Sequence, residues 1–186
     1  MADGEFALIR EYGEAGLIHP SKGWATVGDH DLYCLLADAA AQQRDEAALQ
    51  KYAPLADEFA LRYDHKLYRA ITHRAWGVSH CLVSQYAESQ IQFDRALVIF
   101  QQMNTRWQIG RTLFELGELA VARADNIIAR EYFTRALSEF EMMDALPDMI
   151  RTHEKLESVD PNSKQGRPPR RRNRGHGSPL RNVSNQ

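Results

Sequence analysis

The sequence has few of the features that mark secreted, membrane-spanning or metal-binding proteins. Its only cysteines, Cys34 and Cys81, form no C-x-x-C pair, so neither a disulfide framework nor a zinc ribbon is indicated. No apolar run approaches the roughly 20 residues that cross a bilayer. No charged segment followed by an apolar one marks a signal peptide after Met1. We therefore expect a cytoplasmic protein that makes no membrane contact and keeps both thiols reduced.

The patterns of catalysis and cofactor binding are also missing. Neither G-x-x-x-x-G-K-[ST] nor G-x-G-x-x-G after a strand occurs, which argues against nucleotide binding. His73 and His80 share a helical face beside Cys81, but a metal would need a further ligand from a neighbouring helix, and H-x-x-x-H is absent. We predict no catalytic residues, no metal and no cofactor, and hence a protein that is not an enzyme.

Charge is divided unevenly between the body of the chain and its C-terminal end. The net charge is −2, but residues 1–157 hold 24 acidic and 16 basic residues, whereas residues 158–186 hold seven basic residues and one acidic residue. This last segment has almost no apolar residues, so it cannot bury a core and is predicted to be disordered. Its arginines are candidates for non-specific contact with a polyanion such as nucleic acid. They are Arg167, Arg170, Arg171, Arg172 and Arg174.

An internal repeat dominates the acidic body. A shift of 40 residues superposes a glycine, a small residue, a phenylalanine, an alanine and a second phenylalanine, at offsets 0, 12, 16, 19 and 23. The last four are spaced i, i+4, i+7 and i+11, which is one stripe of an α-helix. The glycine belongs to an earlier helix, where a missing Cβ allows close approach. Each unit is therefore predicted to be a helix, a tight turn at Ser84-Gln85 or Asp125-Asn126, and a second helix.

A weaker copy precedes these two units. The string at residues 29–33 resembles that at 64–68, a shift of 35, and a stripe at Ala48, Tyr52, Leu55 and Phe59 precedes the next stripe by 41. The difference predicts that the first helix of this unit is shorter by about a turn and a half. Pro54 is expected to kink or split the second helix.

These features predict an all-α fold in three parts. Residues 1–28 form an N-terminal helix and loop, residues 29–158 a repeat domain, and residues 159–186 a disordered basic tail. The repeat domain divides into units at about 29–63, 64–103 and 104–143, followed by a closing helix at 147–158 with Pro147 in its first turn. Asp64, and either Asn104 or Thr105, are expected to cap the first helices of the second and third units.

The two strong units resemble the tetratricopeptide repeat, whose helix pair carries a large residue and glycine on its first helix and Ala, Phe and Ala on its second. The matching residues are Trp76, Gly77, Ser89, Phe93 and Ala96, and then Leu116, Gly117, Ala129, Phe133 and Ala136. A period of 40 residues, longer than the usual value of about 34, resembles the long-helix variants of large bacterial signalling ATPases and transcription activators. The resemblance implies a right-handed α-solenoid of antiparallel helix pairs.

The resemblance also implies a concave groove, lined by the first helices of the units, that binds a partner protein or peptide. The groove positions carried over from the family are Arg74, Val78, Cys81, Arg111, Phe114 and Glu118. The family's best-known clamp for a C-terminal carboxylate needs an asparagine where Val78 stands, so this clamp is predicted to be absent. A mixed, partly apolar groove suits a helix or an extended peptide.

Three functions agree with these features. The first is a scaffold or adaptor that holds a partner in the groove. The second is the regulatory part of a bacterial signalling or transcription system that works with a separate ATPase or DNA-binding protein. The third is an RNA- or polyanion-associated protein that acts through the basic tail. Because three units are near the lower limit for independent stability, a homodimer is a further alternative.

Removal of residues 161–186 tests the third function. If the tail arginines bind polyanions, the truncated chain should lose the retention on immobilised RNA that the intact chain shows at low salt, because the phosphate contacts are gone. Equal retention of the two chains would contradict a role for the tail.

Overall fold

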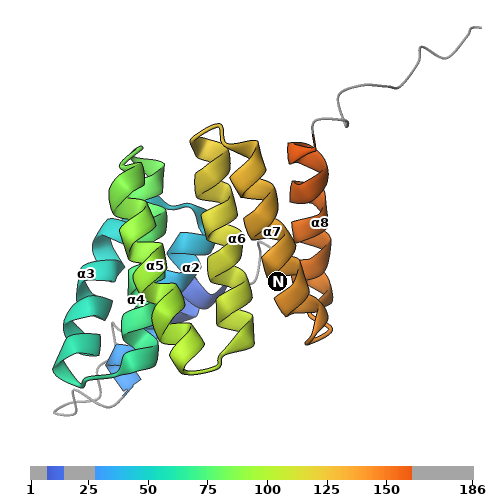
Figure 1. Cartoon of the computed structure of the whole chain (residues 1–186). Helices are drawn as coiled ribbons and strands as arrows, with labels where there is room; N and C mark the ends of the chain where they lie inside the picture. The colour runs from blue at the N-terminus through green and yellow to red at the C-terminus, as the bar shows by residue number, and fades with distance from the viewer. Residues whose placement is uncertain (1–7, 15–27, 161–186) are drawn as a thin grey trace, which may run out of the picture.

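The computed structural model of the chain describes residues 8–14 and 28–160, and all their secondary structure is helical, as predicted (Figure 1). The predicted loop before residue 28 and the basic tail after residue 160 lie outside the described residues. Residues 8–14 form a short helix. Seven longer helices follow: α2 (Gly28–Gln43), α3 (Glu46–Arg62), α4 (Lys66–Leu82), α5 (Tyr86–Gln102), α6 (Arg106–Ala122), α7 (Asn126–Glu141) and α8 (Leu146–Val159).

The long helices are joined by turns that recur every 20 residues. In each turn one non-glycine residue adopts the left-handed conformation, with φ between 47° and 60°; these residues are Arg44, Asp64, Ser84, Asn104, Ala124 and Asp144. The next amide donates to a carbonyl five residues back, as in Asp45 N to Ala40 O at 3.0 Å. This is the Schellman arrangement, which closes a helix so tightly that the next helix begins at once.

The residue after each left-handed residue occupies the N-cap position of the next helix, and at α3, α4 and α7 its side chain accepts a capping hydrogen bond. Asp45 and Asp125 accept a hydrogen bond from the amide three residues on, at 2.9 and 3.1 Å. At α4 the cap is His65, whose Nδ1 accepts from an amide at 3.4 Å, so the prediction of Asp64 is wrong. The tight turn uses Asp64 as its left-handed residue instead. At α6 the cap is Thr105, one of the two predicted residues.

Within each of the two later pairs, a glycine on the first helix receives a phenylalanine from the second. A Cβ added to Gly77 would lie 2.5 Å from the Phe93 ring, and one added to Gly117 would lie 2.5 Å from Phe133. Both rings are fully buried, so the missing Cβ is the space that each ring fills. Ser89, which stands where the next unit has Ala129, donates a buried hydrogen bond to Gly77 O at 2.8 Å, which satisfies its hydroxyl.

The first pair keeps the 40-residue register with smaller side chains. Where the later pairs combine glycine with phenylalanine, this pair combines Ala37 with Ala53, both fully buried. The buried stripe on α3 is Leu49, Ala53, Ala56 and Ala60, 40 residues before the stripe on α5. The predicted stripe, one residue earlier, is confirmed in part: Ala48 and Tyr52 are buried as well, whereas Leu55 and Phe59 are only half-buried.

Two other expectations for the first pair, a shortened first helix and a second helix split at Pro54, are also wrong, while a kink at Pro54 stays a prediction. α2 has 16 residues and α4 has 17, so the first helix is not shorter by a turn and a half. Pro54 does not split the second helix, because α3 runs unbroken from Glu46 to Arg62. Pro54 is exposed, so the helix continues past it with the loss of one hydrogen bond.

The helices form an inner and an outer row. We call α2, α4, α6 and α8 the A helices, and α3, α5 and α7 the B helices. α8 keeps the A register, because Thr72, Thr112 and Thr152 are 40 residues apart, and each buried hydroxyl donates to the carbonyl four residues earlier at 2.6 to 2.8 Å. α2 contacts α4, and α4 contacts α6, whereas the described B helices make no comparable contact with one another. The A helices therefore line the inside of the curved stack.

The two ends of the stack are covered differently. Residues 8–14 pack on α2: a Cβ added to Gly13 would lie 2.9 Å from Leu36 and 3.2 Å from Leu32. At the other end, α8 begins with Pro147 in its first turn, as predicted. Glu157 stands 40 residues after Gly117 and is exposed. α8 therefore lacks the glycine on which α5 and α7 pack their phenylalanines in the preceding pairs.

The glycine–phenylalanine pair is open to a direct test. Gly117→Ala should destabilise the fold by about 1–3 kcal/mol because the new Cβ meets the ring, and Phe133→Ala should cost about 3–5 kcal/mol because it leaves a cavity. The double variant recreates the alanine pair of the first unit, so it should cost less than the sum. Chemical denaturation measures all three, and strict additivity would contradict this packing.

Candidate functional site

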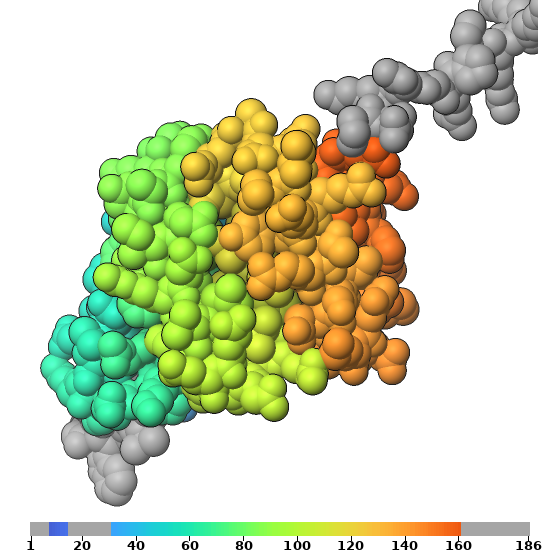
Figure 2. Space-filling model, viewed as in Figure 1, coloured from blue at the N-terminus to red at the C-terminus, as the bar shows by residue number. Residues whose placement is uncertain are grey.

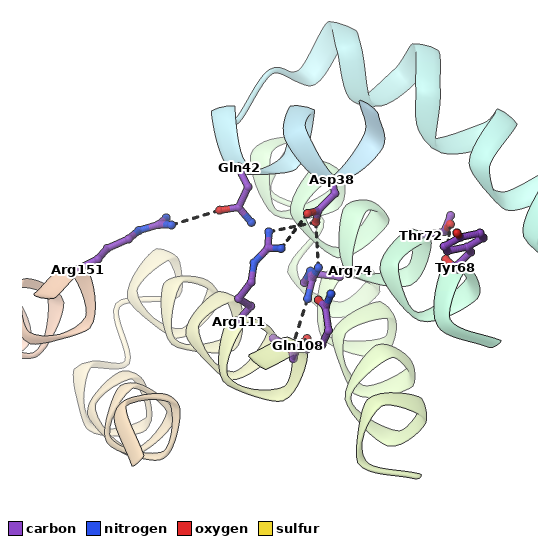
Figure 3. A network of polar contacts seen from close by, with 9 residues as sticks. Asp38, Gln42, Tyr68, Thr72, Arg74, Gln108, Arg111 and Arg151 are labelled. Atoms are coloured by element: carbon purple, nitrogen blue, oxygen red, sulfur yellow. Dashed lines mark hydrogen bonds and ion pairs between the residues drawn. The ribbon is translucent and has the colours of Figure 1, made fainter. Parts of the chain in front are cut away.

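The first A helix, α2, crosses the inner face that the other A helices share. Asp38 on α2 accepts from Arg74 Nη2 on α4 at 2.9 Å and from Arg111 Nη1 on α6 at 2.8 Å (Figure 3). One turn later, the side-chain amide of Gln42 lies between Arg151 on α8 and Arg111 on α6. α2 therefore reaches all three later A helices. From the side shown in Figure 2, it is almost hidden behind the later pairs.

Asp38 is the centre of this contact and is held as a carboxylate. Burial opposes its ionisation, but Arg111 and Arg74 outweigh burial and hold the pKa of Asp38 well below its usual range. The Arg74 side chain is only 1% exposed. Burial, and then repulsion from Arg111, lower the pKa of Arg74 to about 10, so its guanidinium is charged at neutral pH. Two cations therefore share one carboxylate.

A second set of ion pairs ties the end of α2 to α6 and α8. Arg44 Nη1 lies 2.6 Å from Glu115 Oε2, and Arg44 Nη2 lies 3.9 Å from Glu118 Oε2. Glu118 also pairs with Lys155 Nζ at 2.9 Å. Burial opposes protonation of Arg44, but Glu115 outweighs it and raises the pKa of Arg44. Because Glu115 is buried, the loss of Arg44 would leave a carboxylate without its main ionic partner.

Each arginine that contacts α2 from a later A helix also stacks on an aromatic ring. The pairs, with the distance from the guanidinium carbon to the ring centre, are Arg74–Phe100 (5.2 Å), Arg111–Trp107 (4.6 Å) and Arg151–Phe114 (4.3 Å). Trp107 is fixed in turn, because its Nε1 donates to Asp148 Oδ2 at 3.0 Å. Cation–π contacts of this kind orient a guanidinium while its N–H groups stay free to donate.

The structure brings the predicted groove residues together but does not leave all of them open. Arg74, Val78, Arg111 and Phe114 are buried, and Cys81 and Glu118 are half-buried. Four of the six side chains are therefore not accessible in a groove, contrary to the expectation. The physical reason is that α2 packs on α4 and crosses α6 and α8. Partner binding at these six positions stays a prediction.

The sequence reasoning missed Asp38, the residue on which this arrangement depends. A signal for it exists: Asp38 is the only charged residue between Asp31 and Arg44, within an otherwise apolar run. A lone acid in such a run must be paired if it is buried. The partners could not be chosen from the sequence, because Arg74 and Arg111 lie 36 and 73 residues away.

Beside this polar network, the N-terminal halves of α2, α4 and α6 leave a cleft of about 530 Å³. Ile9, Leu35, Ile71 and Trp107 supply most of its apolar wall, and Asp31 and Asp38 add carboxylates. Leu35 is 53% exposed. Burial raises the pKa of the neighbouring Cys34 thiol to about 12, so this cysteine supplies no thiolate at neutral pH. The cleft is built for contact with apolar groups.

The histidines singled out in the sequence take part in ordinary hydrogen bonds. His73 pairs with Gln92 and His80 with Gln85, each at 2.7 Å. Burial lowers the pKa of His73. Within residues 8–14 and 28–160, no group of three or more His, Cys, Asp or Glu side chains is placed to hold a metal ion. In the same residues, no helix combines the length and the apolar character that crossing a membrane requires.

Comparison with known proteins does not assign the chain to a family: no protein-family model matches the chain, and no curated protein matches it. The function proposed for the chain therefore rests on the repeat, the polar network around Asp38 and the cleft beside it.

Asp38→Asn should lower the free energy of unfolding by about 3 kcal/mol, because it leaves Arg74 and Arg111 without their counter-charge. Since the folded state depresses the pKa of Asp38, its contribution is complete above the unfolded value of about 3.9 and is lost as the pH falls below it. Urea denaturation between pH 7 and pH 3 should therefore show a smaller acid-induced loss in the variant. Parallel pH profiles would contradict this assignment.

Proposed function

We propose that this chain is a non-enzymatic interaction module of the tetratricopeptide type, a right-handed solenoid that holds a peptide segment of a partner protein on its A-helix face. Three observations support the proposal. The helix pairs repeat every 40 residues, and two of them pack a phenylalanine on a glycine. The A helices contact one another on the inside of the stack, and the B helices lie outside. Such stacks present an extended inner surface for binding.

The observation that carries the proposal is the cleft between the N-terminal halves of α2, α4 and α6. Its volume of about 530 Å³ lies within the range of ligand sites, and its wall is mainly apolar. Three long helices and the short helix at residues 8–14 converge on it. Leu35 and Trp107 offer large apolar surfaces to a side chain of the partner. The ligand is a short segment with apolar side chains, held between α2 and α6.

A displayed library of random peptides tests the cleft. Peptides selected on the intact chain should be rich in apolar residues and should lose binding to the variant Leu35→Arg, because a charge then stands in the apolar wall. The matched control is Leu61→Arg on α3, since Leu61 is 56% exposed and lies outside the cleft. This control should bind the same peptides with unchanged affinity.

Two results would contradict the proposal. Either no peptide is enriched above background on the folded chain, or the enriched peptides bind Leu35→Arg as well as they bind the Leu61→Arg control. Circular dichroism of both variants should remain helical, since both positions are more than half exposed.

A further inference from the structure

The last A helix, α8, is followed by no B helix among the described residues (Figure 1). The preceding pair shows which side of α8 such a helix would cover. On α6, Arg106 forms an ion pair with α7 at 3.3 Å, and a Cβ added to Gly110 would lie 2.7 Å from the Phe140 ring on α7. The residues 40 positions later, on α8, are Leu146 and Ile150. These two residues therefore face the side on which a B helix would pack.

This side of α8 is apolar and exposed. Leu146 is 61% exposed and Ile150 is 54% exposed, and Met142, at the end of α7, is 61% exposed. The terminal helix of a helical-repeat stack ordinarily turns a polar face to the solvent. Exposed apolar side chains that gather on one face are typical of an interaction surface. The end of the stack is therefore suited to contact with a second apolar surface.

The side of α7 next to α8 is uncovered as well. Asn126 and Arg130 on α7 are exposed, whereas Tyr86 and Gln90, which stand 40 positions earlier on α5, are half-buried. The difference follows from the order of the helices, because a complete pair follows α5, whereas only α8 follows α7 in the described part of the chain.

A groove of about 850 Å³ lies where the N-terminal half of α7 meets the C-terminal end of α8. Ile127 and Val159 supply its apolar wall, and Ile127 is 76% exposed. Leu146 begins α8 and Val159 ends it, 13 residues later, so about 20 Å of helix separates Leu146 from the groove. One end of α8 thus carries an exposed apolar side chain, and the other end borders an apolar groove.

This arrangement is complementary to itself. If the α8 helices of two copies lie antiparallel across a two-fold axis, Leu146 of each copy meets the groove of the other. The contact then forms twice, as in every two-fold symmetric dimer. Ile150, near the middle of α8, lies close to the axis and packs against the α8 helix of the second copy.

The charges at the two ends agree with the same antiparallel arrangement. Arg130 and Arg135 line the groove beside a single carboxylate. The segment 141–150, which surrounds Leu146, has three acidic residues and no basic residue. One of the acids is Asp144, which is exposed in the turn before α8. Placing Leu146 in the groove of the second copy therefore brings acidic residues to its arginines.

We propose that the face formed by α7 and α8 is the contact surface of a two-fold symmetric homodimer. Leu146 of each copy occupies the groove of the other at Ile127 and Val159, and Asp144 pairs with Arg130 across the interface. The second copy supplies the apolar cover that the end of this three-pair stack lacks. The face lies apart from the cleft proposed for peptide binding, so the two inferences are independent.

Sedimentation velocity of the full chain tests the dimer. The face is about 21 Å long and two helices wide, which makes a small interface, so the dimer should dissociate in the micromolar range. Leu146→Glu should weaken association at least about tenfold, because it places a charge in the apolar groove. The matched control is Leu61→Glu on α3, which is 56% exposed at the other end of the stack and should associate like the intact chain.

A charge exchange tests the register of the two copies. Arg130→Glu and Asp144→Arg should each weaken the dimer, because each variant places like charges opposite one another. The combined variant restores opposite charges and should regain most of the affinity. Arginine is compatible with the left-handed conformation of Asp144, since Arg44 adopts this conformation in the first turn.

Three outcomes would overturn the proposal. The first is a monomer at all concentrations up to several hundred micromolar, which would mean that the groove is empty or is filled from within the chain. The second is equal association of Leu146→Glu and Leu61→Glu. The third is a combined variant that associates no better than the two single variants. Peptide binding that depends on Leu35 would be unaffected by any of these results.

Discussion

The structure depends on one shared carboxylate. Asp38 lies where three A helices meet, and together with Arg44 it joins the first helix pair to the third. Arg74 is buried and charged, so the fold can hold it only if a counter-charge is delivered from α2. The same end of α2 is brought close enough to α6 and α8 for Asp38, Gln42 and Arg44 to contact them.

A second constraint, steric in origin, makes the helix pairs alike. The tight turns return at intervals of 20 residues, and the equivalent buried positions of the three pairs hold Gly77–Phe93, Gly117–Phe133 and Ala37–Ala53. Because the turns recur at this interval, equivalent positions on successive A helices stand 40 residues apart. A row of parallel helices is what allows a single crossing helix, α2, to contact all the others.

The repeat was open to prediction from the sequence, and the crossing of α2 was not. The periods of glycine and phenylalanine are local signals, so the two later pairs and the all-helical class follow from them directly. The first pair was placed one residue out of register, because alanines at 53, 56 and 60 carry no distinctive signal. The groove was predicted as open because Arg74 and Arg111 stand at groove positions. Asp38 is 36 residues from Arg74 and 73 residues from Arg111, and the sequence pattern alone cannot show that it pairs with both.

A double-mutant cycle between Asp38 and Arg111 tests the central claim most directly. It compares the unfolding free energies of the intact chain, Asp38→Asn, Arg111→Gln and the combined variant. If α2 is held across α6 by this pair, the coupling energy should be favourable and at least about 1 kcal/mol, as for buried charge pairs in direct contact. A coupling energy near zero would mean that α2 does not lie on α6 in solution, and it would contradict the account.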